Sequence, residues 1–332
     1  MGRTMITREI QLSSHVTGVP GLEHFTVAEA DVDGEVLVRT EQVGLAATYL
    51  ELMRADCHLP VPAWQPGQRV GLAAIGTVVR SASDALQVGD LVQSMTGWSE
   101  YSAGPARSYV ELDRDAFPDP GFHLGQGPTA FYGMADIAQV GVGDVVFVSG
   151  AAGGVGSLAG QIAKQLGAAR VIGSAGTAAK VDHLVDDLGF DAAFDYHDDP
   201  AARLKELAPE GISVFFDVVG GAQYDAALQV ARPGARFALC GSLSSQLGDA
   251  AERFPQPDRA EAEARGVVLS PFSCHHTPEQ ISAWQKHFRA WLDEGRFVYP
   301  QTVVEGAITD VPQAFLALLQ GAYRGNVSVR LT

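Results

Sequence analysis

The first third of the chain carries short apolar runs that alternate with polar residues and are separated by turn-forming residues. Such runs, rich in β-branched side chains and bounded by glycine, proline or aspartate, are typical of strands. Many short strands in succession predict a small β-barrel or sandwich. Strands are expected here at residues 35–40, 69–72, 75–80 and 109–112, and a further strand directly after the Gly-Asp turn signal within residues 88–92.

Beyond residue 120 the pattern changes to apolar runs that alternate with amphipathic segments. Residues 145–149 form a continuous apolar run, as in a strand buried on both faces. Residues 155–166 then place apolar side chains at helical spacing, and Gly167 follows as a stop signal. The repeated alternation predicts a parallel sheet covered by helices, the doubly wound architecture. Further strands are expected at 171–174, 192–196, 212–218, 235–239 and 267–272, and further helices at 129–137, 178–188, 200–207, 223–231 and 278–292.

The last part of the chain returns to β character. Residues 298–305 and 326–331 read as strands, with a helix at 311–320 between them. The charged, proline-containing segment 248–265 is expected to be a loop or a helix.

A glycine-rich turn follows the first buried strand, in the sequence Ser-Gly-Ala-Ala-Gly-Gly-Val-Gly at residues 149–156. The turn needs small residues because a diphosphate must approach backbone N–H groups that a Cβ would cover. The helix that follows offers unpaired amides and the positive end of its dipole to the phosphates. A flexible turn is the alternative, but the strand before and the helix after match a dinucleotide site.

The residues at the end of the strand predicted at 171–174, the second strand of the parallel sheet, indicate whether the cofactor is NAD or NADPH. Sites for NAD carry an acidic residue there, hydrogen-bonded to the ribose 2′-hydroxyl. Residues 170–180 contain no acid, whereas Ser174 and Thr177 can donate hydrogen bonds and Lys180 can place a positive charge on a 2′-phosphate. A solvated lysine is the alternative interpretation of Lys180, although a cation is unfavourable in the first turn of a helix. The sequence therefore predicts NADPH.

Charge and cysteine usage exclude several classes of protein. The 39 acidic and 23 basic side chains give a net charge of -16, which repels phosphate backbones and argues against a nucleic-acid partner. The three widely spaced cysteines argue for a reducing compartment. We find neither a signal peptide nor an apolar run long enough to span a membrane, and we expect a cytoplasmic protein.

The motifs together resemble a known family. They are the glycine-rich turn, Gly-Ser-x-Gly-x-x-x-Lys at 173–180, Phe-Asp-Tyr at 194–196, Asp-Val-Val-Gly-Gly at 217–221 and Cys-Gly-Ser at 240–242. This set is similar to the leukotriene B4 dehydrogenase/prostaglandin reductase branch of the zinc-free medium-chain dehydrogenase/reductase superfamily, which includes curcumin and alkenal reductases. Residues 44–50 look closer to quinone oxidoreductases.

The resemblance implies a fold and a domain plan. It implies a GroES-like β-barrel catalytic domain at 1–120, a Rossmann doubly wound cofactor domain at 121–295 and a C-terminal segment at 296–332 that returns to the catalytic domain. It also implies NADPH, a homodimer and no metal. By position, Lys180 and Tyr196 would hold the 2′-phosphate, and residues 272–274 would bind the nicotinamide carboxamide through their backbone. The predicted cofactor contacts are Thr129, Ala152, Gly153, Gly154, Val155, Gly156, Ser174, Gly176, Thr177, Lys180, Tyr196, Val219, Cys240, Gly241, Ser242, Phe272, Ser273, Cys274 and Asn326.

The chain departs from this branch at three places. Gln246 stands where relatives carry a tyrosine, Ala47-Thr48-Tyr49 replaces an Asp-Pro-Tyr segment, and Gly325-Asn326 replaces Gly-Lys. The fold and the cofactor survive these changes, whereas the substrate pocket cannot be carried over.

Catalysis by hydride transfer requires few protein groups. Tyr49 is the candidate donor to the carbonyl oxygen of a substrate, with a packed aromatic side chain as the alternative. The spacings around Cys57-His58 and Cys274-His275-His276 do not form a zinc site, because adjacent residues of an extended chain point in opposite directions.

We therefore expect NADPH-dependent reduction of the C=C bond of an enone or 2-alkenal, by hydride transfer to the β-carbon. The alternatives are an NADPH:quinone oxidoreductase and a protein that binds NADPH without turnover.

Overall fold

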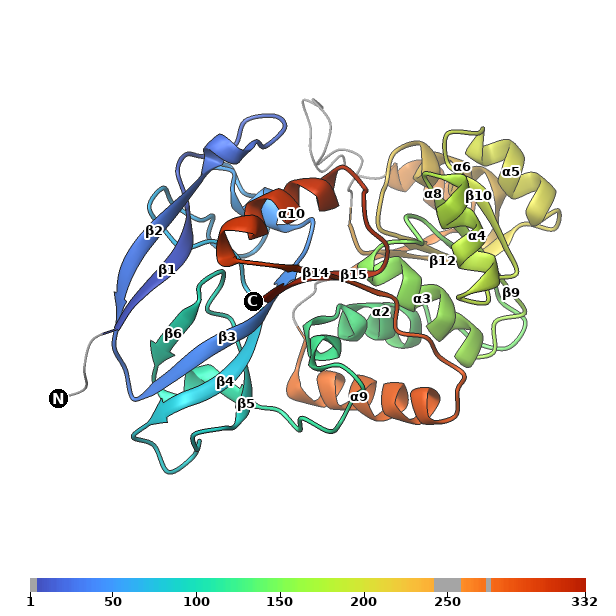
Figure 1. Cartoon of the computed structure of the whole chain (residues 1–332). Helices are drawn as coiled ribbons and strands as arrows, with labels where there is room; N and C mark the ends of the chain where they lie inside the picture. The colour runs from blue at the N-terminus through green and yellow to red at the C-terminus, as the bar shows by residue number, and fades with distance from the viewer. Residues whose placement is uncertain (1–4, 242–257, 273–275) are drawn as a thin grey trace. The chain divides into compact units, whose positions relative to one another are not determined.

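The strands of the protein gather into three sheets that belong to two parts of the chain (Figure 1). The computed structural model describes residues 5–241, 258–272 and 276–332. Unit 1 comprises Met1–Gly125 and Gln301–Thr332, and unit 2 comprises Gln126–Pro300. No helix of the described residues is both long and apolar enough to cross a membrane.

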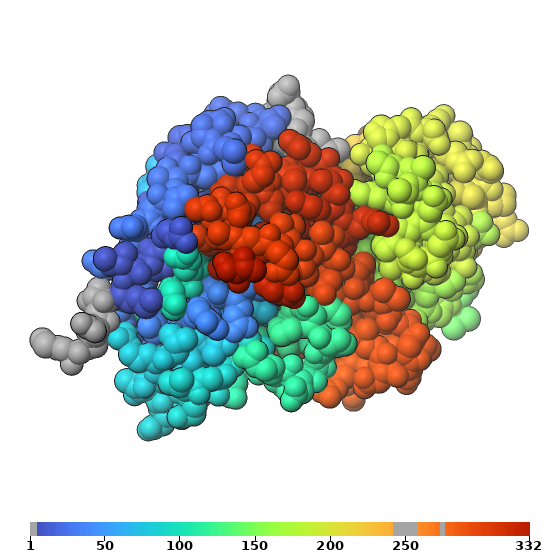
Figure 2. Space-filling model, viewed as in Figure 1, coloured from blue at the N-terminus to red at the C-terminus, as the bar shows by residue number. Residues whose placement is uncertain are grey.

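Unit 1 is built on β structure, as its alternating apolar pattern predicts. A seven-stranded sheet has the order β14-β15-β3-β4-β5-β7, with β6 paired to β3, and β1 and β2 form a separate antiparallel pair. Figure 2 shows the C-terminal residues of this unit, in orange and red, lying against its N-terminal residues in blue. The strands are β1 (Met5–Leu12), β2 (Phe25–Val32), β3 (Val36–Leu45), β4 (Ala74–Ser81), β5 (Leu91–Ser94), β6 (Tyr101–Gly104), β7 (Tyr109–Glu111), β14 (Gln301–Gly306) and β15 (Asn326–Leu331). The helical segments are η1 (Leu22–His24), α1 (Tyr49–Leu52), η2 (Ala106–Ser108), η3 (Pro120–Leu124), η5 (Ile308–Asp310) and α10 (Val311–Leu319).

The strand predicted at residues 69–72 was wrong. The backbone of Val70 is hydrogen-bonded to Ile10 and Trp98, but the only β pairing within residues 69–72 is an isolated bridge between Arg69 and Gln11. Gly71 then has a φ of +86°, which no residue of a regular strand adopts. A Cβ on this glycine would stand 2.3 Å from the Trp98 ring, so both the turn and the close packing need glycine here.

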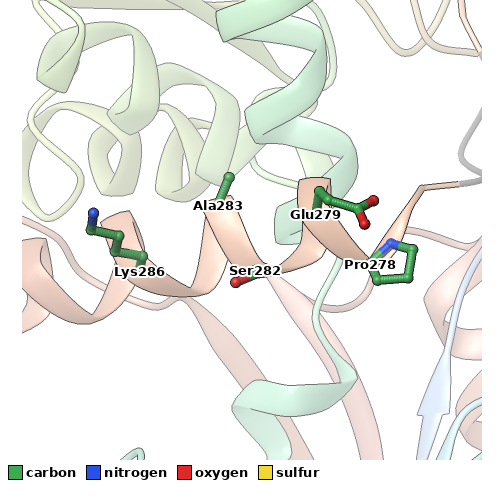
Figure 3. Close-up of a pocket in the computed structure, with 5 residues that line it drawn as sticks. All are labelled: Pro278, Glu279, Ser282, Ala283 and Lys286. Carbon is green, nitrogen blue, oxygen red and sulfur yellow. The ribbon is translucent and has the colours of Figure 1, made fainter.

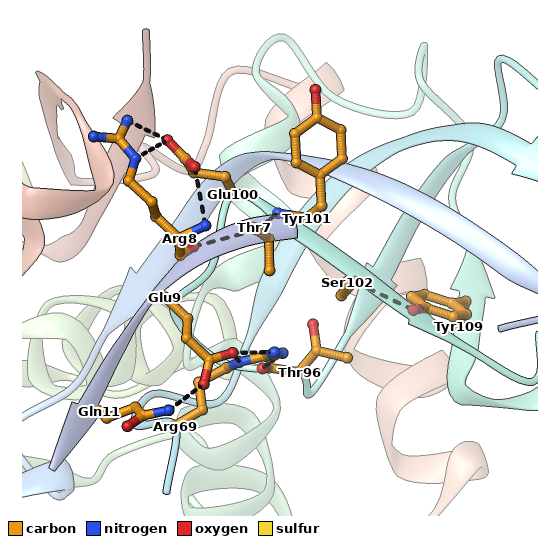
Figure 4. A network of polar contacts seen from close by, with 10 residues as sticks. All are labelled: Thr7, Arg8, Glu9, Gln11, Arg69, Thr96, Glu100, Tyr101, Ser102 and Tyr109. Carbon is orange, nitrogen blue, oxygen red and sulfur yellow. Dashed lines mark hydrogen bonds and ion pairs between the residues drawn. The ribbon is translucent and has the colours of Figure 1, made fainter. Parts of the chain in front are cut away.

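Ion pairs and hydrogen bonds fix β1 to the neighbouring segments (Figure 4). Glu9 on β1 is only 4% exposed, and it accepts hydrogen bonds from Arg69 Nε at 2.5 Å and Gln11 Nε2 at 2.9 Å. Arg69 also donates to the carbonyl oxygen of Thr96 at 3.1 Å. A buried carboxylate with a guanidinium partner is tolerated in the interior of unit 1 because its charge is neutralised.

Unit 2 contains the doubly wound fold. Its six strands are all parallel, in the order β10-β9-β8-β11-β12-β13, with helices in the connections. The strands are β8 (Val145–Val148), β9 (Arg170–Ala175), β10 (Ala192–Asp195), β11 (Ile212–Asp217), β12 (Ala231–Leu239) and β13 (Val268–Pro271). The helices are α2 (Gly127–Tyr132), η4 (Gly133–Ile137), α3 (Gly154–Gln165), α4 (Ala178–Asp186), α5 (Pro200–Leu207), α6 (Ala222–Val230), α8 (Arg259–Ala264) and α9 (Pro278–Asp293). The predicted fold class is confirmed.

Phenylalanine rings fill the centre of unit 2. Phe147, Phe215 and Phe237 stand in register on β8, β11 and β12. The ring centroids of Phe147 and Phe215 are 5.0 Å apart, and those of Phe215 and Phe237 are 5.1 Å apart. This buried row aligns the three central strands, so their carboxyl ends meet at one edge of the sheet.

The predicted helix at 129–137 changes its winding part-way. Residues Gly133–Ile137 form a π-helix, with Ala138 N donating to Gly133 O at 2.9 Å. A Cβ on Gly133 would stand 2.5 Å from the Phe216 ring and 2.6 Å from the Phe272 ring. Glycine at this position therefore lets the helix pack closely over the ends of β11 and β13.

The strand predicted at 298–305 begins later, at Gln301. Val298 is instead held in unit 2, where its N–H donates to Gln161 Oε1 at 2.8 Å and its carbonyl accepts from Gln161 Nε2 at 2.9 Å. Pro300, which has no N–H to give to a ladder, precedes the strand.

Candidate active site

The order of the strands in unit 2 defines where a dinucleotide can bind. The chain runs outward from β8 through β9 to β10 on one side, and from β11 through β12 to β13 on the other. The direction in which successive strands are added reverses between β8 and β11, and we call this place the switch point of the sheet. In doubly wound sheets, ligands bind in the crevice at the carboxyl ends of the two strands at this point. The turns that follow β8, β9, β11 and β12 meet at this edge.

The glycine-rich turn joins β8 to α3. Gly150 has φ +57°, a conformation that side chains rarely adopt, and Gly153 caps α3 with an extended backbone. A Cβ on Gly156 would stand 2.6 Å from Gly150 O and 2.8 Å from Ala151 Cα. Gly153 is exposed, whereas Ala152 and Val155 are buried beneath the turn. The strand, the tight glycine turn and the helix N-terminus thus follow one another in the order expected of a diphosphate site.

Ser174 and Gln223 lie beneath this turn. Ser174 is fully buried, its hydroxyl donates to Gln223 Oε1, and Gly150 N donates to the Ser174 Oγ at 3.3 Å. Ala151 N donates to the Ser174 carbonyl at 2.8 Å. The Ser174 hydroxyl thus supports the turn from inside, a role that sequence reasoning did not foresee. Gln223 was missed altogether, because nothing in its local sequence marks it.

The ends of β9 and β10 form a second cluster. Tyr196 follows β10 and is 42% exposed. A Cβ on Gly176 would stand 2.7 Å from the Tyr196 hydroxyl, so the ring passes close to this glycine. Thr177 caps α4 by accepting a hydrogen bond from Lys180 N at 3.3 Å, and Lys180 lies in the first turn of that helix. Gly176 and Tyr196 thus lie close together beside Thr177, whereas Ser174, also predicted to bond the 2′-phosphate, is fully buried and donates its hydroxyl to Gln223.

Asp217 ties together the turns on the other side of the switch point. Its Oδ1 accepts hydrogen bonds from the Ser149 hydroxyl at 2.9 Å, from Gly220 N at 2.8 Å and from Val219 N at 3.0 Å. Its backbone carbonyl accepts from Cys240 N at 2.8 Å and Gly241 N at 3.1 Å. The backbone N–H groups of Val219, Cys240 and Gly241, all predicted cofactor contacts, are therefore hydrogen-bonded to this one buried residue.

The end of β13 carries the remaining predicted contacts of unit 2. Phe272 lies there, and its ring is 5.9 Å from that of Tyr132. Thr129 on α2 is hydrogen-bonded through its hydroxyl to His276 Nε2 at 2.9 Å. Ser242, Gln246, Ser273 and Cys274 lie outside the described residues. Asn326 belongs to unit 1, where it begins β15 and is buried.

Tyr49, the candidate proton donor, lies in unit 1 at the start of α1. It is 5% exposed, and its ring lies 5.6 Å from Trp64, 6.1 Å from Trp98 and 6.3 Å from Phe315. Burial raises the pKa of its hydroxyl to about 12, against backbone hydrogen bonds from Ala73 and Leu72 that lower it. At neutral pH the phenol therefore keeps its proton, and it can act as a hydrogen-bond donor but not as a base.

A shallow depression of about 480 Å³ runs along α9 (Figure 3). It is lined by α9 alone, through Pro278, Glu279, Ser282, Ala283 and Lys286. A depression on one helix lacks the converging polar groups of a ligand site, so we place the active site at the switch point instead.

Comparison with known proteins agrees with this geometry. Residues 154–280 match the family model described as zinc-binding dehydrogenase, and residues 8–112 match the N-terminal domain of oxidoreductase. A putative NADP-dependent oxidoreductase of Bacillus subtilis, YfmJ, is 33% identical over 99% of this chain and 99% of its own. The NADPH-dependent curcumin reductase of Escherichia coli is 32% identical over 96% of this chain and 95% of its own. The chain belongs to the medium-chain dehydrogenase/reductase family.

Within this family the chain falls in the branch of NADP-dependent reductases, as the motifs indicated. The crystal structure of CurA from Vibrio vulnificus in complex with NADPH superimposes with a TM-score of 0.88, at 29% identity, over 98% of this chain and 99% of that one. The resemblance stated from the sequence is thus confirmed.

The name of the matching family model raises the question of zinc. Among residues 5–241, 258–272 and 276–332, no three side chains of histidine, cysteine, aspartate or glutamate gather as metal ligands. The Cys57 thiol lies against the Val61 carbonyl oxygen at 3.8 Å, and the His58 ring pairs with Glu51 at 3.1 Å. These residues of the medium-chain reductase do not fit a zinc site, which needs four converging ligands or three and a water.

Proposed function

We propose that the protein uses NADPH to reduce the C=C bond of an α,β-unsaturated carbonyl compound, an enone or 2-alkenal. The choice of NADPH as cofactor is supported by the turn after β9, where Thr177 and Lys180 stand in place of the acidic residue of NAD sites. The substrate class is supported by the Escherichia coli relative, whose name is NADPH-dependent curcumin reductase.

In this reaction the protein mainly binds and orients the cofactor and the substrate. The bound cofactor supplies a hydride, which the β-carbon of the substrate accepts. Negative charge then develops on the carbonyl oxygen, where a hydrogen-bond donor stabilises the enolate, and the α-carbon takes a proton from a donor or from water. The turns after β8, β9, β11 and β12 of unit 2 would hold the cofactor in position, and we propose the Tyr49 hydroxyl as the donor.

Turnover of a small panel tests this function. NADPH oxidation is followed with an aliphatic enone, a 2-alkenal, a naphthoquinone and a saturated ketone. We expect oxidation with the enone or the alkenal, and a product heavier than the substrate by two hydrogens. Reaction with the quinone alone would favour a quinone oxidoreductase. NADPH binding without oxidation by any of the four would indicate a protein that holds the cofactor without turnover.

Tyr49→Phe separates catalysis from packing at this position. The substitution keeps the ring among Trp64, Trp98 and Phe315 and removes only the hydroxyl. Loss of a donor to developing charge lowers kcat by about 10²-fold, and we expect a drop of that size with little change in the NADPH KM. A kcat within twofold of the unmodified protein would leave Tyr49 with a packing role only. Tyr109→Phe, in which a second buried tyrosine loses its bond to Ser102, is the matched control.

We also propose that the protein is a cytoplasmic homodimer. The free edge of β13 supports a second copy, since among the described strands it pairs only with β12, and Val268 on it is 54% exposed. An unpaired apolar edge strand is a template for pairing with another chain. The odd number of widely spaced cysteines, Cys57, Cys240 and Cys274, is in keeping with a reducing compartment. Sedimentation of the purified protein measures the oligomeric state directly.

A further inference from the structure

A single buried acid connects three turns of the cofactor site. Asp217 is 3% exposed, and Ser149, which bridges it to the glycine-rich turn, is fully buried. The Ser149 hydroxyl donates to Asp217 and accepts hydrogen bonds from Val218 N at 2.8 Å and Val219 N at 3.2 Å. The network therefore spans the carboxyl ends of β8 and β11, the two strands of the switch point.

The turns held by this network need such support. Gly220 and Gly221 have φ of +74° and +57°, so the turn after β11 follows an unusual path. A Cβ on Gly150 would stand 2.9 Å from Val219 Cγ2, which brings the turns after β8 and β11 into contact. Displacement of Asp217 or Ser149 would therefore move both turns at once.

Burial of a charged carboxylate at Asp217 lowers the free energy of unfolding. Burial raises the pKa of its carboxyl to about 6, although hydrogen bonds from Gly220, Ser149 and Val219 lower it. Tyr224 on α6 interacts electrostatically with Asp217, and its own pKa is raised to about 12 by burial and then by the charges of Asp217, Asp225, Asp258 and Glu261. A neutral asparagine has the same shape and could accept the same bonds at lower cost.

We propose that Asp217 and Ser149 are positioning residues whose side chains hold the turns after β8 and β11 in the shape that binds NADPH, at the expense of folding stability. The inference rests on the proposed cofactor. An ionised acceptor makes hydrogen bonds about twice as strong as a neutral one, so the carboxylate rigidifies the turns more than an amide can. Turns fixed before binding lose less conformational freedom when the cofactor arrives.

Ser149→Ala tests the hydrogen bonds by which the Ser149 hydroxyl joins Asp217 to the backbone of Val218 and Val219. We expect the Kd for NADPH, measured by fluorescence titration, to rise about tenfold, because Val218 N and Asp217 lose a shared buried partner. Ser157→Ala is the matched control: Ser157 is also fully buried in unit 2, and its hydroxyl has no hydrogen-bond partner among the described residues. The control is expected to keep its Kd within about twofold. An unchanged Kd in Ser149→Ala overturns the proposal.

Asp217→Asn tests the charge. At about pH 8 we expect its Kd for NADPH to rise roughly tenfold while the urea midpoint stays the same or increases. A group with a raised native pKa contributes stability that is present below its ordinary pKa of 3.8 and lost as pH rises through about 6. The stability of the variant relative to the unmodified protein should therefore increase over that range. Lower stability with an unchanged Kd would mean that Asp217 is only structural.

The pH dependence of binding supplies the last readout. In the unmodified protein the affinity for NADPH should weaken as pH falls through about 6, as Asp217 takes up a proton. The 2′-phosphate of the cofactor titrates near the same value, so only the difference between the unmodified protein and Asp217→Asn is informative. Identical profiles in the two proteins contradict the inference. Because these measurements need binding and not turnover, inactivity on every substrate of the panel leaves this inference standing, whereas failure of the unmodified protein to bind NADPH overturns the proposed function itself.

Discussion

Gly156→Ala is expected to abolish measurable NADPH binding and to destabilise the fold by about 2 kcal/mol. The new Cβ would stand 2.6 Å from Gly150 O and 2.8 Å from Ala151 Cα, and both are backbone atoms that cannot rotate away. Helix α3 must then move from β8, which deforms the turn at the helix N-terminus where the diphosphate is expected to bind. Alanine favours a helix over glycine by about 1 kcal/mol, so the clash must exceed this gain. Urea unfolding and fluorescence titration with NADPH measure the two effects.

Two other glycines serve for comparison with this substitution, Gly153 in the same turn and Gly141 before β8. Gly153→Ala adds a Cβ at an ordinary 3.4 Å from Gly150 O, at an exposed position of the turn. It should keep its stability yet weaken NADPH binding, because the methyl group occupies space needed by the phosphates. Gly141→Ala, where the Cβ meets no atom within 4 Å, should change neither. Normal binding by Gly156→Ala would rule out the glycine-rich turn as the phosphate site.

Lys180→Ala is expected to raise the KM for NADPH by about 10- to 100-fold and to leave that for NADH nearly unchanged. NADH lacks the 2′-phosphate, so the charge of Lys180 has nothing to bind there. The capping bond of α4 survives, because Thr177 accepts it from the backbone N–H of residue 180. Removal of a cation from the first turn should leave stability equal or slightly higher.

The matched control is Lys205→Ala, in the last turn of α5 on the exposed surface. It removes the same charge from the same unit, and both cofactors should keep their KM values. Parallel losses for NADPH and NADH in Lys180→Ala would contradict the assignment of this lysine to the 2′-phosphate.

Local patterns in the sequence predicted most of the fold. The apolar runs of β8, β9 and β11 and the spacing in α3 repeat over short distances, and such periodicity is written in consecutive residues. Strand β1 was missed because Arg8 and Glu9 interrupt its alternation. Glu9 is buried nevertheless, since Arg69, 60 residues later in the chain, neutralises it.

The sequence by itself determined the doubly wound unit, the glycine-rich turn and the absence of an acid after β9, because each depends on neighbouring residues. Only the tertiary structure decided the roles of Ser149, Gln223 and Asp217. Ser149 and Asp217 are 68 positions apart, and Ser174 and Gln223 are 49 apart, yet both pairs share buried hydrogen bonds. The sequence alone does not distinguish a polar residue at the end of a strand that faces water from one that faces a buried hydrogen-bond partner. Its burial, and hence the energetic need for that partner, arises only when the strands assemble.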